Sequence, residues 1–311
     1  MDAFESRLLI DGEWQSSRSG AVMPVIDPRT AEPFTRVAQA GQADTLRAID
    51  AADRAFLPWA RLNVFERTAL MRKAALRVLE QRETIAKAMT LEQGKPFAEA
   101  LGEVEKGAEI LRYYAGEGER VYGRIIENST PGIQSMVVYQ PVGTAAAICP
   151  WNYPVELLAW KLGGALAAGC SVICKFSSET PVSPALFVKA VNEAGFPAGV
   201  INTLNGNGAE IGNVLLASEK VKKIAFTGST ATGISVLAAS AKTLKKTSME
   251  LGGSLPMLVF ADCDIDEAVK GAARRSFRNM GQICIAVNRI YVQKNIYEEF
   301  LAKMKTETEK L

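Results

Sequence analysis

The stretch KKIAFTGSTATG, residues 222–233, has the pattern of a buried strand that turns sharply into a helix. The strand is predicted to end at Phe226, and Ser229 is a suitable N-cap for the helix that follows the turn. Backbone N–H groups at such a helix start, together with the positive end of the helix dipole, can bind an anion such as pyrophosphate. An ordinary capped turn without a ligand is the alternative interpretation.

Strands and helices alternate in the same way on both sides of this stretch. Predicted strands cover Thr144–Cys149, Ser171–Lys175, Val200–Leu204, Lys222–Thr227 and Thr247–Leu251. Helices are predicted near 154–168, 182–194, 209–217 and 231–242. This alternation predicts an α/β fold with a Rossmann-like parallel sheet and right-handed crossovers. A second cycle begins at Met257–Phe260 and continues with a helix over 264–279, a strand over 289–293 and a helix over 295–310.

The N-terminal 142 residues have a different organisation. Residues 1–40 are predicted to form short strands and turns, and the pattern is helical from Asp44 to Tyr114, with an interruption at 94–96. Residues 119–142 then form two extended arms around the turn Thr130-Pro131-Gly132. Because a hairpin that stands apart from a sheet is marginally stable alone, we expect it to pair with another subunit.

The composition excludes several classes of function. The chain has 311 residues, is 48% hydrophobic and carries a net charge of +2, so neither nucleic acid nor an anionic membrane is an expected partner. It contains no histidine, which excludes Ser-His-Asp and Cys-His catalysis and leaves no expected metal site. With no signal-peptide pattern and no apolar stretch of about 18–20 residues, we expect a cytoplasmic protein.

The cysteines are odd in number and form no CxxC pair, which argues against a disulfide framework. Cys149, Cys170, Cys174 and Cys263 lie in apolar strands or at a strand exit, where a cysteine is usually a buried hydrophobe. Cys284 follows a small turn, Gly281-Gln282-Ile283, that would allow close approach of a substrate. From this residue alone, however, burial is the favoured interpretation.

Three other motifs could carry chemistry. Asn152 lies between two prolines at the end of the first sheet strand and could donate to an oxyanion, although it could also satisfy a turn. Glu250 ends the fifth strand and, without histidine, is the leading candidate for a general base; a solvated glutamate is the alternative. The glycines Gly206, Gly208 and Gly212 resemble a dinucleotide fingerprint whose last spacing is one residue too long, so a tight turn is an equal alternative.

Taken in order, the segments PWN, K-x-S, FTGSTxxG, ELGG and GQxC resemble the aldehyde dehydrogenase superfamily over essentially the whole chain. The resemblance implies that Cys284 is the nucleophile, Glu250 the water-activating base and Asn152 an oxyanion donor. It implies a cofactor, NADP or NAD, held by Ile148, Trp151, Asn152, Lys175, Ser178, Glu179, Gly208, Phe226, Gly228, Ser229, Gly233 and Leu251. It also implies an NAD(P)-binding domain over 1–118 and 142–251, an oligomerisation hairpin over 119–141 and a partial catalytic domain over 252–311.

The succinate-semialdehyde dehydrogenase branch is the most similar part of the family. Arg278 matches one of two arginines that hold the distant carboxylate in that branch, whereas Trp160 stands where the other would be. The indole favours a less polar aldehyde or a different pose. NAD-preferring members usually carry glutamate at the position of Ser178, so the resemblance favours NADP, with Glu179 as a contrary feature.

Members of the family continue well beyond Leu311, and the further part would supply most of the catalytic domain. Three interpretations follow for the 311 residues. They could be a fragment of a longer aldehyde dehydrogenase, which would be a homo-oligomer, dimer or tetramer. They could be a truncated product that binds dinucleotide with weak or no catalysis. They could also be an interaction protein that pairs with a full-length homologue through the hairpin. An exposed apolar patch near Cys284 is expected if the chain acts alone.

Overall fold

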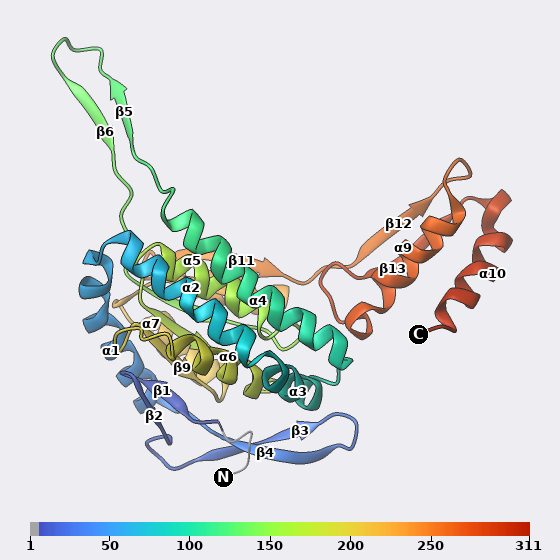
Figure 1. Cartoon of the computed structure of the whole chain (residues 1–311), viewed down its shortest axis with the longest axis horizontal. Helices are drawn as coiled ribbons and strands as arrows, with labels where there is room; N and C mark the ends of the chain where they lie inside the picture. The colour runs from blue at the N-terminus through green and yellow to red at the C-terminus, as the bar shows by residue number, and fades with distance from the viewer. Residues whose placement is uncertain (1–5) are drawn as a thin grey trace. The chain divides into compact units, whose positions relative to one another are not determined.

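The structure, a computed structural model, describes residues 6–311 and divides the chain into two compact units (Figure 1). The first unit comprises Met1–Thr227 and Ala231–Met249, and the second comprises Gly228–Thr230 and Glu250–Leu311. Within residues 6–311, no helix has the length and apolar character needed to cross a membrane. The predicted domain boundaries, which differ slightly from these units, remain a prediction.

A five-stranded sheet forms the centre of the first unit, with the strand order β11-β10-β7-β8-β9. The strands are β7 (Thr144–Ile148), β8 (Val172–Lys175), β9 (Ile201–Leu204), β10 (Val221–Gly228) and β11 (Lys246–Leu251). The pairs β10–β7, β7–β8 and β8–β9 are parallel. The chain order reverses between β7 and β10, and α/β sheets of this kind bind ligands beyond the carboxyl ends of the strands at such a point. The predicted Rossmann-like α/β fold is therefore confirmed.

Helices cover both faces of this sheet because its strand residues alternate between two apolar cores. Ala147 and Cys174 lie in one core, whereas their neighbours Ala146 and Ile173 lie in the other. The crossover helices are α5 (Glu156–Ala167), α6 (Val182–Asn192), α7 (Gly208–Ala217) and α8 (Thr230–Ala241). Four earlier helices pack around them: α1 (Gln42–Arg61), α2 (Val64–Glu80), α3 (Arg82–Gln93) and α4 (Phe97–Gly118). The predicted helical segments are thus confirmed, with breaks near 62 and 81 that the sequence pattern did not indicate.

The N-terminal strands form two small antiparallel sheets. β1 (Leu8–Ile10) pairs with β2 (Glu13–Gln15), and β3 (Val22–Asp27) pairs with β4 (Glu32–Ala38). Asp11 and Gly12 form the turn between β1 and β2 with φ angles of +56° and +83°. Glycine adopts a positive φ without steric cost because it has no Cβ, so only Asp11 is in an unfavourable conformation. The Leu9 N–H donates to Thr203 Oγ1 at 2.8 Å, which attaches β1 to the edge strand β9.

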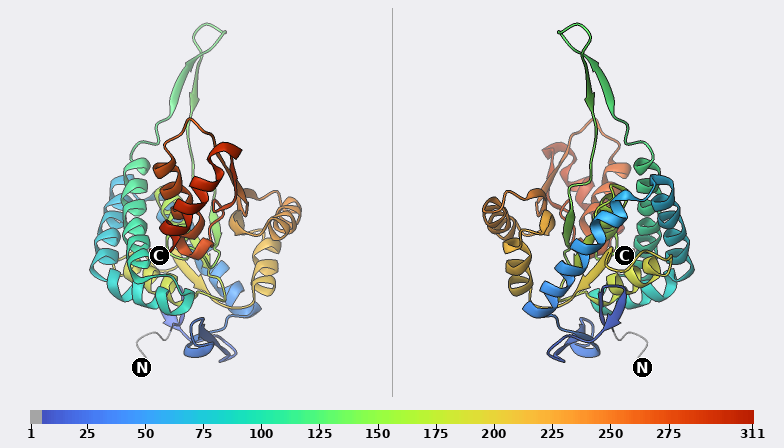
Figure 2. Two further views of the ribbon diagram at one scale, coloured as in Figure 1. Left: turned by 90° about the vertical axis from the view of Figure 1, so that its right-hand side faces the viewer. Right: turned by 90° about the vertical axis from the view of Figure 1, so that its left-hand side faces the viewer.

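The predicted hairpin is present as β5 (Arg124–Glu127) and β6 (Gln134–Val137). Ile125 faces Met136 in the register, and each side chain is 71% exposed. Figures 1 and 2 show both strands extending away from the sheet and helices of the first unit. The structure therefore confirms a hairpin that stands apart from the sheet. Its pairing with another subunit remains a prediction.

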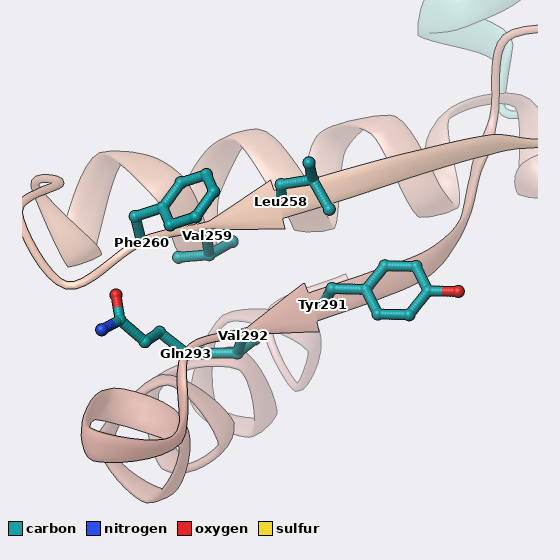
Figure 3. A pocket seen from close by; sticks show the side chains of 6 residues that line it. All are labelled: Leu258, Val259, Phe260, Tyr291, Val292 and Gln293. Atoms are coloured by element: carbon teal, nitrogen blue, oxygen red, sulfur yellow. The ribbon is translucent and has the colours of Figure 1, made fainter.

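The second unit contains the predicted second strand–helix–strand cycle. β12 (Leu255–Val259) and β13 (Val287–Val292) are parallel and are joined through α9 (Ile265–Phe277), and α10 (Tyr297–Thr308) follows. Val259, Val269, Ala272 and Phe300 form a small core between these elements. A shallow hollow in this unit is lined by the ends of β12 and β13, at Leu258, Val259, Phe260, Tyr291, Val292 and Gln293 (Figure 3).

Candidate active site

The carboxyl ends of three adjacent strands bring several predicted cofactor residues together in the first unit. Ile148 on β7 is opposite Phe226 on β10 and Lys175 on β8, so the register places all three at one edge. Trp151, which is 40% exposed, and Asn152 follow directly after β7. Their loop is attached to the neighbouring loop by Thr180, whose Oγ1 donates to the Trp151 carbonyl at 3.2 Å.

The loop after β8 carries the residues predicted to contact the cofactor ribose. Ser178 Oγ donates to the Gly206 carbonyl at 3.2 Å, so this hydroxyl is directed toward the loop after β9. Glu179 is exposed and accepts a hydrogen bond from Ser177 Oγ. Lys175 is buried, and desolvation lowers its pKa, while nearby Glu179 acts in the opposite direction.

The glycine cluster of the sequence lies where β9 gives way to α7. Asn207 caps this helix, because its Oδ1 accepts from the Ala209 N–H at 2.9 Å and the Glu210 N–H at 3.1 Å. A Cβ built on Gly208 would lie 3.6 Å from Lys175 Nζ, so the buried ammonium sits beside the start of the helix. A helix start beside a lysine suits a bound anion. The strand-to-helix context expected for the cluster is therefore confirmed, and its role as a ligand site remains a prediction.

The stretch that follows β10 is divided between the two units. Lys161 Nζ donates to Thr227 Oγ1 at 2.7 Å, which fixes the end of β10 to α5. α8 begins at Thr230, directly after Ser229, as predicted, and Gly233 is buried within it. Gly228 belongs to the second unit, where its carbonyl accepts from the Gly252 N–H at 3.2 Å.

Both predicted catalytic residues of the second unit are accessible. Glu250 and Leu251 are exposed at the end of β11, and Cys284 is also exposed. The burial favoured for Cys284 on its residue type alone is therefore wrong, since the thiol-bearing residue lies in a loop before β13 instead of in a core. A Cβ on Gly253 would lie 3.3 Å from the Cys284 carbonyl oxygen, so the chain after Glu250 runs close to the chain at Cys284.

A left-handed turn precedes Cys284. Asn279, Met280 and Gly281 have φ angles of +50°, +57° and +74°, two of them in residues for which this conformation is unfavourable. A Cβ on Gly281 would lie 3.0 Å from the Ser276 carbonyl oxygen. Strained turns of this kind are typical of functional loops that aim a side chain. The sequence indicated a small turn here but not its handedness.

The two residues assigned to the substrate lie in different units. Arg278 is exposed at the end of α9, and Trp160 on α5 is 38% exposed. Trp160 packs edge-on against Tyr114, with ring centroids 5.8 Å apart at 87°, and against Tyr113 at 6.4 Å. The three rings form an aromatic cluster on α4 and α5 for which the sequence carries no motif.

The sequence pattern of the aldehyde dehydrogenase family matches residues 14–311. The chain belongs to the aldehyde dehydrogenase family. It is 41% identical over 308 residues to the glutarate-semialdehyde dehydrogenase of Pseudomonas putida and, over the same length, to the NADP(+) succinate-semialdehyde dehydrogenase of Escherichia coli. Each alignment covers 99% of this chain and 64% of the relative.

Solved structures of the family have the same fold. The crystal structure of an NADP-dependent enzyme from E. coli superimposes with a TM-score of 0.98 at 40% identity, covering 100% of this chain and 64% of that one. This aldehyde dehydrogenase chain thus spans about 64% of the length of the relatives that it matches. The resemblance stated from the motifs is confirmed.

Several residues that support the site carried no recognised motif. Glu92, Lys95 and Glu103 are buried charged residues on or between α3 and α4, and each contacts backbone beside a site loop. The sequence offered one signal for Glu103, which lies three residues after Ala100 and four before Gly107 on the buried stripe of α4. A charged residue at such a position needs a partner in the core.

Proposed function

We propose that this chain carries the chemistry of NAD(P)-dependent oxidation of an aldehyde to a carboxylic acid, with Cys284 as the nucleophile. The proposal depends on one observation, which is that a single cysteine side chain is exposed to solvent in a chain that has no histidine to activate another nucleophile. Of the five cysteines, all within the described residues, Cys284 alone is exposed. It follows a left-handed turn and lies beside the chain that carries Glu250.

Each catalytic residue has one role in this proposal. The Cys284 thiolate forms a bond to the aldehyde carbon, while the carbonyl electron pair moves to oxygen and is stabilised by the Asn152 amide and the Cys284 N–H. Bound NAD(P)⁺ would supply the acceptor for the hydride that leaves this carbon. Glu250 then takes a proton from water, whose oxygen attacks the acyl carbon; the carbon–sulfur bond breaks and releases the carboxylic acid and the Cys284 thiolate.

The strand ends of the first unit fit a dinucleotide. Lys175 offers a buried ammonium beside the start of α7, and a side chain at Gly208 would occupy the space next to it. Ser178 offers a neutral hydroxyl at the position where a glutamate would repel a 2′-phosphate. We therefore propose NADP as the preferred cofactor, with NAD accepted. Glu179, whose carboxylate would oppose a 2′-phosphate, accepts a hydrogen bond from Ser177 instead.

The substrate proposed is a semialdehyde or a related aldehyde with an apolar segment. Arg278 could pair with a distant anionic group of the substrate, as the similarity to the two semialdehyde dehydrogenases suggests. Trp160 supplies an indole packed against two tyrosines instead of a second arginine. An aldehyde with an apolar surface at the end distant from its reactive carbon would suit that face.

The test is formation of reduced nicotinamide by the purified chain, followed by absorbance with NADP⁺ or NAD⁺. Succinate semialdehyde, a medium-length aliphatic aldehyde and an aromatic aldehyde form the substrate panel. We expect turnover that Cys284→Ala abolishes and that Cys263→Ala, the matched control in the same unit, retains. Turnover that survives Cys284→Ala would refute the assignment of the nucleophile.

Dinucleotide binding without turnover is a second candidate function. The strands β7, β8 and β9 and the loops that follow them lie within one compact unit, whereas Glu250 and Cys284 are exposed in the other. Saturable binding of NADP⁺ in calorimetry, with no reduced cofactor formed from any aldehyde of the panel, would favour this candidate. Co-purification with a full-length homologue would instead favour pairing through the hairpin.

A further inference from the structure

A buried ion pair lies directly beneath the loop that carries Asn152. Lys95 Nζ contacts Glu103 Oε2, and both side chains are 1% exposed. Lys95 follows α3, in the segment that precedes α4, and Glu103 lies in the second turn of α4. Both residues belong to the same compact unit as Asn152.

The pair contacts the loop on both sides of Pro154. Lys95 Nζ donates to the backbone carbonyl of Asn152 at 3.0 Å and lies 4.2 Å from the centroid of the Tyr153 ring. Glu103 Oε1 accepts from the Val155 N–H at 2.9 Å and the Glu156 N–H at 3.1 Å. The ammonium therefore fixes the entry to the loop segment, and the carboxylate fixes its exit into α5.

Stability alone is a weak reason to keep these charges. Burial raises the pKa of Glu103, while Lys95 acts to lower it. Holding the ionised carboxylate away from water therefore costs free energy. Buried ion pairs can often be replaced by apolar residues of similar volume without loss of stability. Their distinctive property is geometric, since charged hydrogen bonds hold backbone groups in one arrangement.

We propose that Lys95 and Glu103 are positioning residues that fix Asn152 as an oxyanion donor. The inference rests on the proposed function for the role of Asn152. The Lys95–Glu103 pair with its contacts to residues 152–156, called the clamp below, lies within the first unit and does not depend on that function. Neither residue touches the reacting atoms in this scheme. They act through the carbonyl of Asn152 and the two N–H groups that follow Pro154.

Glu92 provides an internal comparison. It is also buried, on the preceding helix α3, and its carboxylate accepts from the Val182 N–H at 2.7 Å and the Ser183 N–H at 2.8 Å at the start of α6. Glu92 and Glu103 thus cap the helices that follow β8 and β7, respectively. Lys95 adds the bond to the Asn152 carbonyl. A substitution at Lys95 should therefore loosen the loop after β7, whereas a substitution at Glu92 should loosen the start of α6 after β8.

The test uses the double substitution Lys95→Met/Glu103→Gln in the 311-residue chain. The amide oxygen of the new glutamine can still accept from the two N–H groups at the start of α5, while the bond to the Asn152 carbonyl is lost and no unpaired charge is left buried. Lys245→Met is the matched control. It removes another lysine whose ammonium holds backbone carbonyls, those of Ser218 and Val221, far from Asn152 in the sequence.

Kinetics separate positioning from general stabilisation. We expect the double substitution to lower kcat about 10- to 100-fold with KM for cofactor nearly unchanged, which is less than the roughly 10²- to 10³-fold loss caused by removing an oxyanion donor altogether. Added to Asn152→Ala, it should cause little further loss, because it acts through that residue. Losses that multiply, or an equal loss of kcat in Lys245→Met, would overturn the inference.

Amide hydrogen exchange tests the clamp independently of catalysis. The double substitution should accelerate exchange over residues 151–156 and leave 182–186 unchanged, whereas Glu92→Gln should do the reverse. Unchanged exchange over 151–156 would overturn the inference. If the parent chain shows no turnover, the proposed function fails while exchange still decides whether the clamp exists.

Discussion

Replacement of Glu92 by glutamine should flatten the pH dependence of stability. Burial raises the pKa of Glu92 from 4.5 to about 8, although three hydrogen bonds from Val182 and Ser183 act to lower it. The folded chain therefore keeps a proton that the unfolded chain releases between these two pH values. Stability from this group is greatest at low pH and is lost as pH rises, at up to about 1.4 kcal/mol per pH unit.

The size of the effect follows from the two pKa values. Between pH 6 and 9 the unfolded carboxyl is ionised throughout, whereas the folded carboxyl ionises only above about 8. The free energy of unfolding of the parent should consequently fall by about 2–3 kcal/mol more than that of Glu92→Gln over this interval. Other titrating groups are common to both proteins and cancel in the difference.

Urea unfolding followed by circular dichroism at pH 6, 7, 8 and 9 measures this difference. Glu210→Gln is the control, because Glu210 accepts from the Gln42 N–H at an exposed position. We expect this control to follow the parent curve. If Glu92→Gln also follows the parent from pH 6 to 9, the hydrogen bonds outweigh desolvation and the carboxyl is already ionised at pH 6.

Three further substitutions test a turn, the loop after β8 and the aromatic cluster on α4 and α5. Gly199→Ala should destabilise the chain by about 1–3 kcal/mol in urea unfolding, because φ is +80° and the new Cβ would lie 2.6 Å from the Ala51 carbonyl oxygen; Gly102→Ala, with nothing within 4 Å, should not. Ser178→Glu should raise the preference for NAD⁺, and an unchanged ratio of kcat/KM for NADP⁺ and NAD⁺ would contradict the ribose assignment. Trp160→Arg should favour succinate semialdehyde over an aliphatic aldehyde in kcat/KM, about 10-fold if it restores one charge-assisted bond; equal effects on both substrates would count against it.

Much of the fold could be predicted because the spacing of apolar residues and the positions of turn residues indicate the same strands and helices along the sheet. The strands from Thr144 to Leu251 are short apolar runs, and each is followed by a helical stretch, which fixes a parallel sheet with crossovers. The hairpin was also recognisable, since its two arms surround a Thr-Pro-Gly turn. Strand order required the tertiary structure, because apolar runs alone do not say which neighbours pair.

The site was predictable only in part, because its supporting contacts join distant parts of the chain. Residue type alone favours burial for Cys284, whereas the structure shows it exposed, after a left-handed turn at 279–281 and with its backbone close to Gly253. Glu103 contacts Val155 across 52 positions, which no local pattern records. Polar residues on the buried stripes of α3 and α4 are the one signal that could have located such supports.

In the proposed mechanism, Cys284 forms an acyl-enzyme that Glu250 hydrolyses. Rapid mixing of Glu250→Gln with NADP⁺ and a reactive aldehyde, with absorbance of reduced cofactor followed and intact mass measured, tests it most directly. We expect a burst of at most one reduced cofactor per chain, slow turnover afterwards, and an added acyl mass located on Cys284. Steady turnover at the parent rate, or a burst without acyl mass on Cys284, would contradict it.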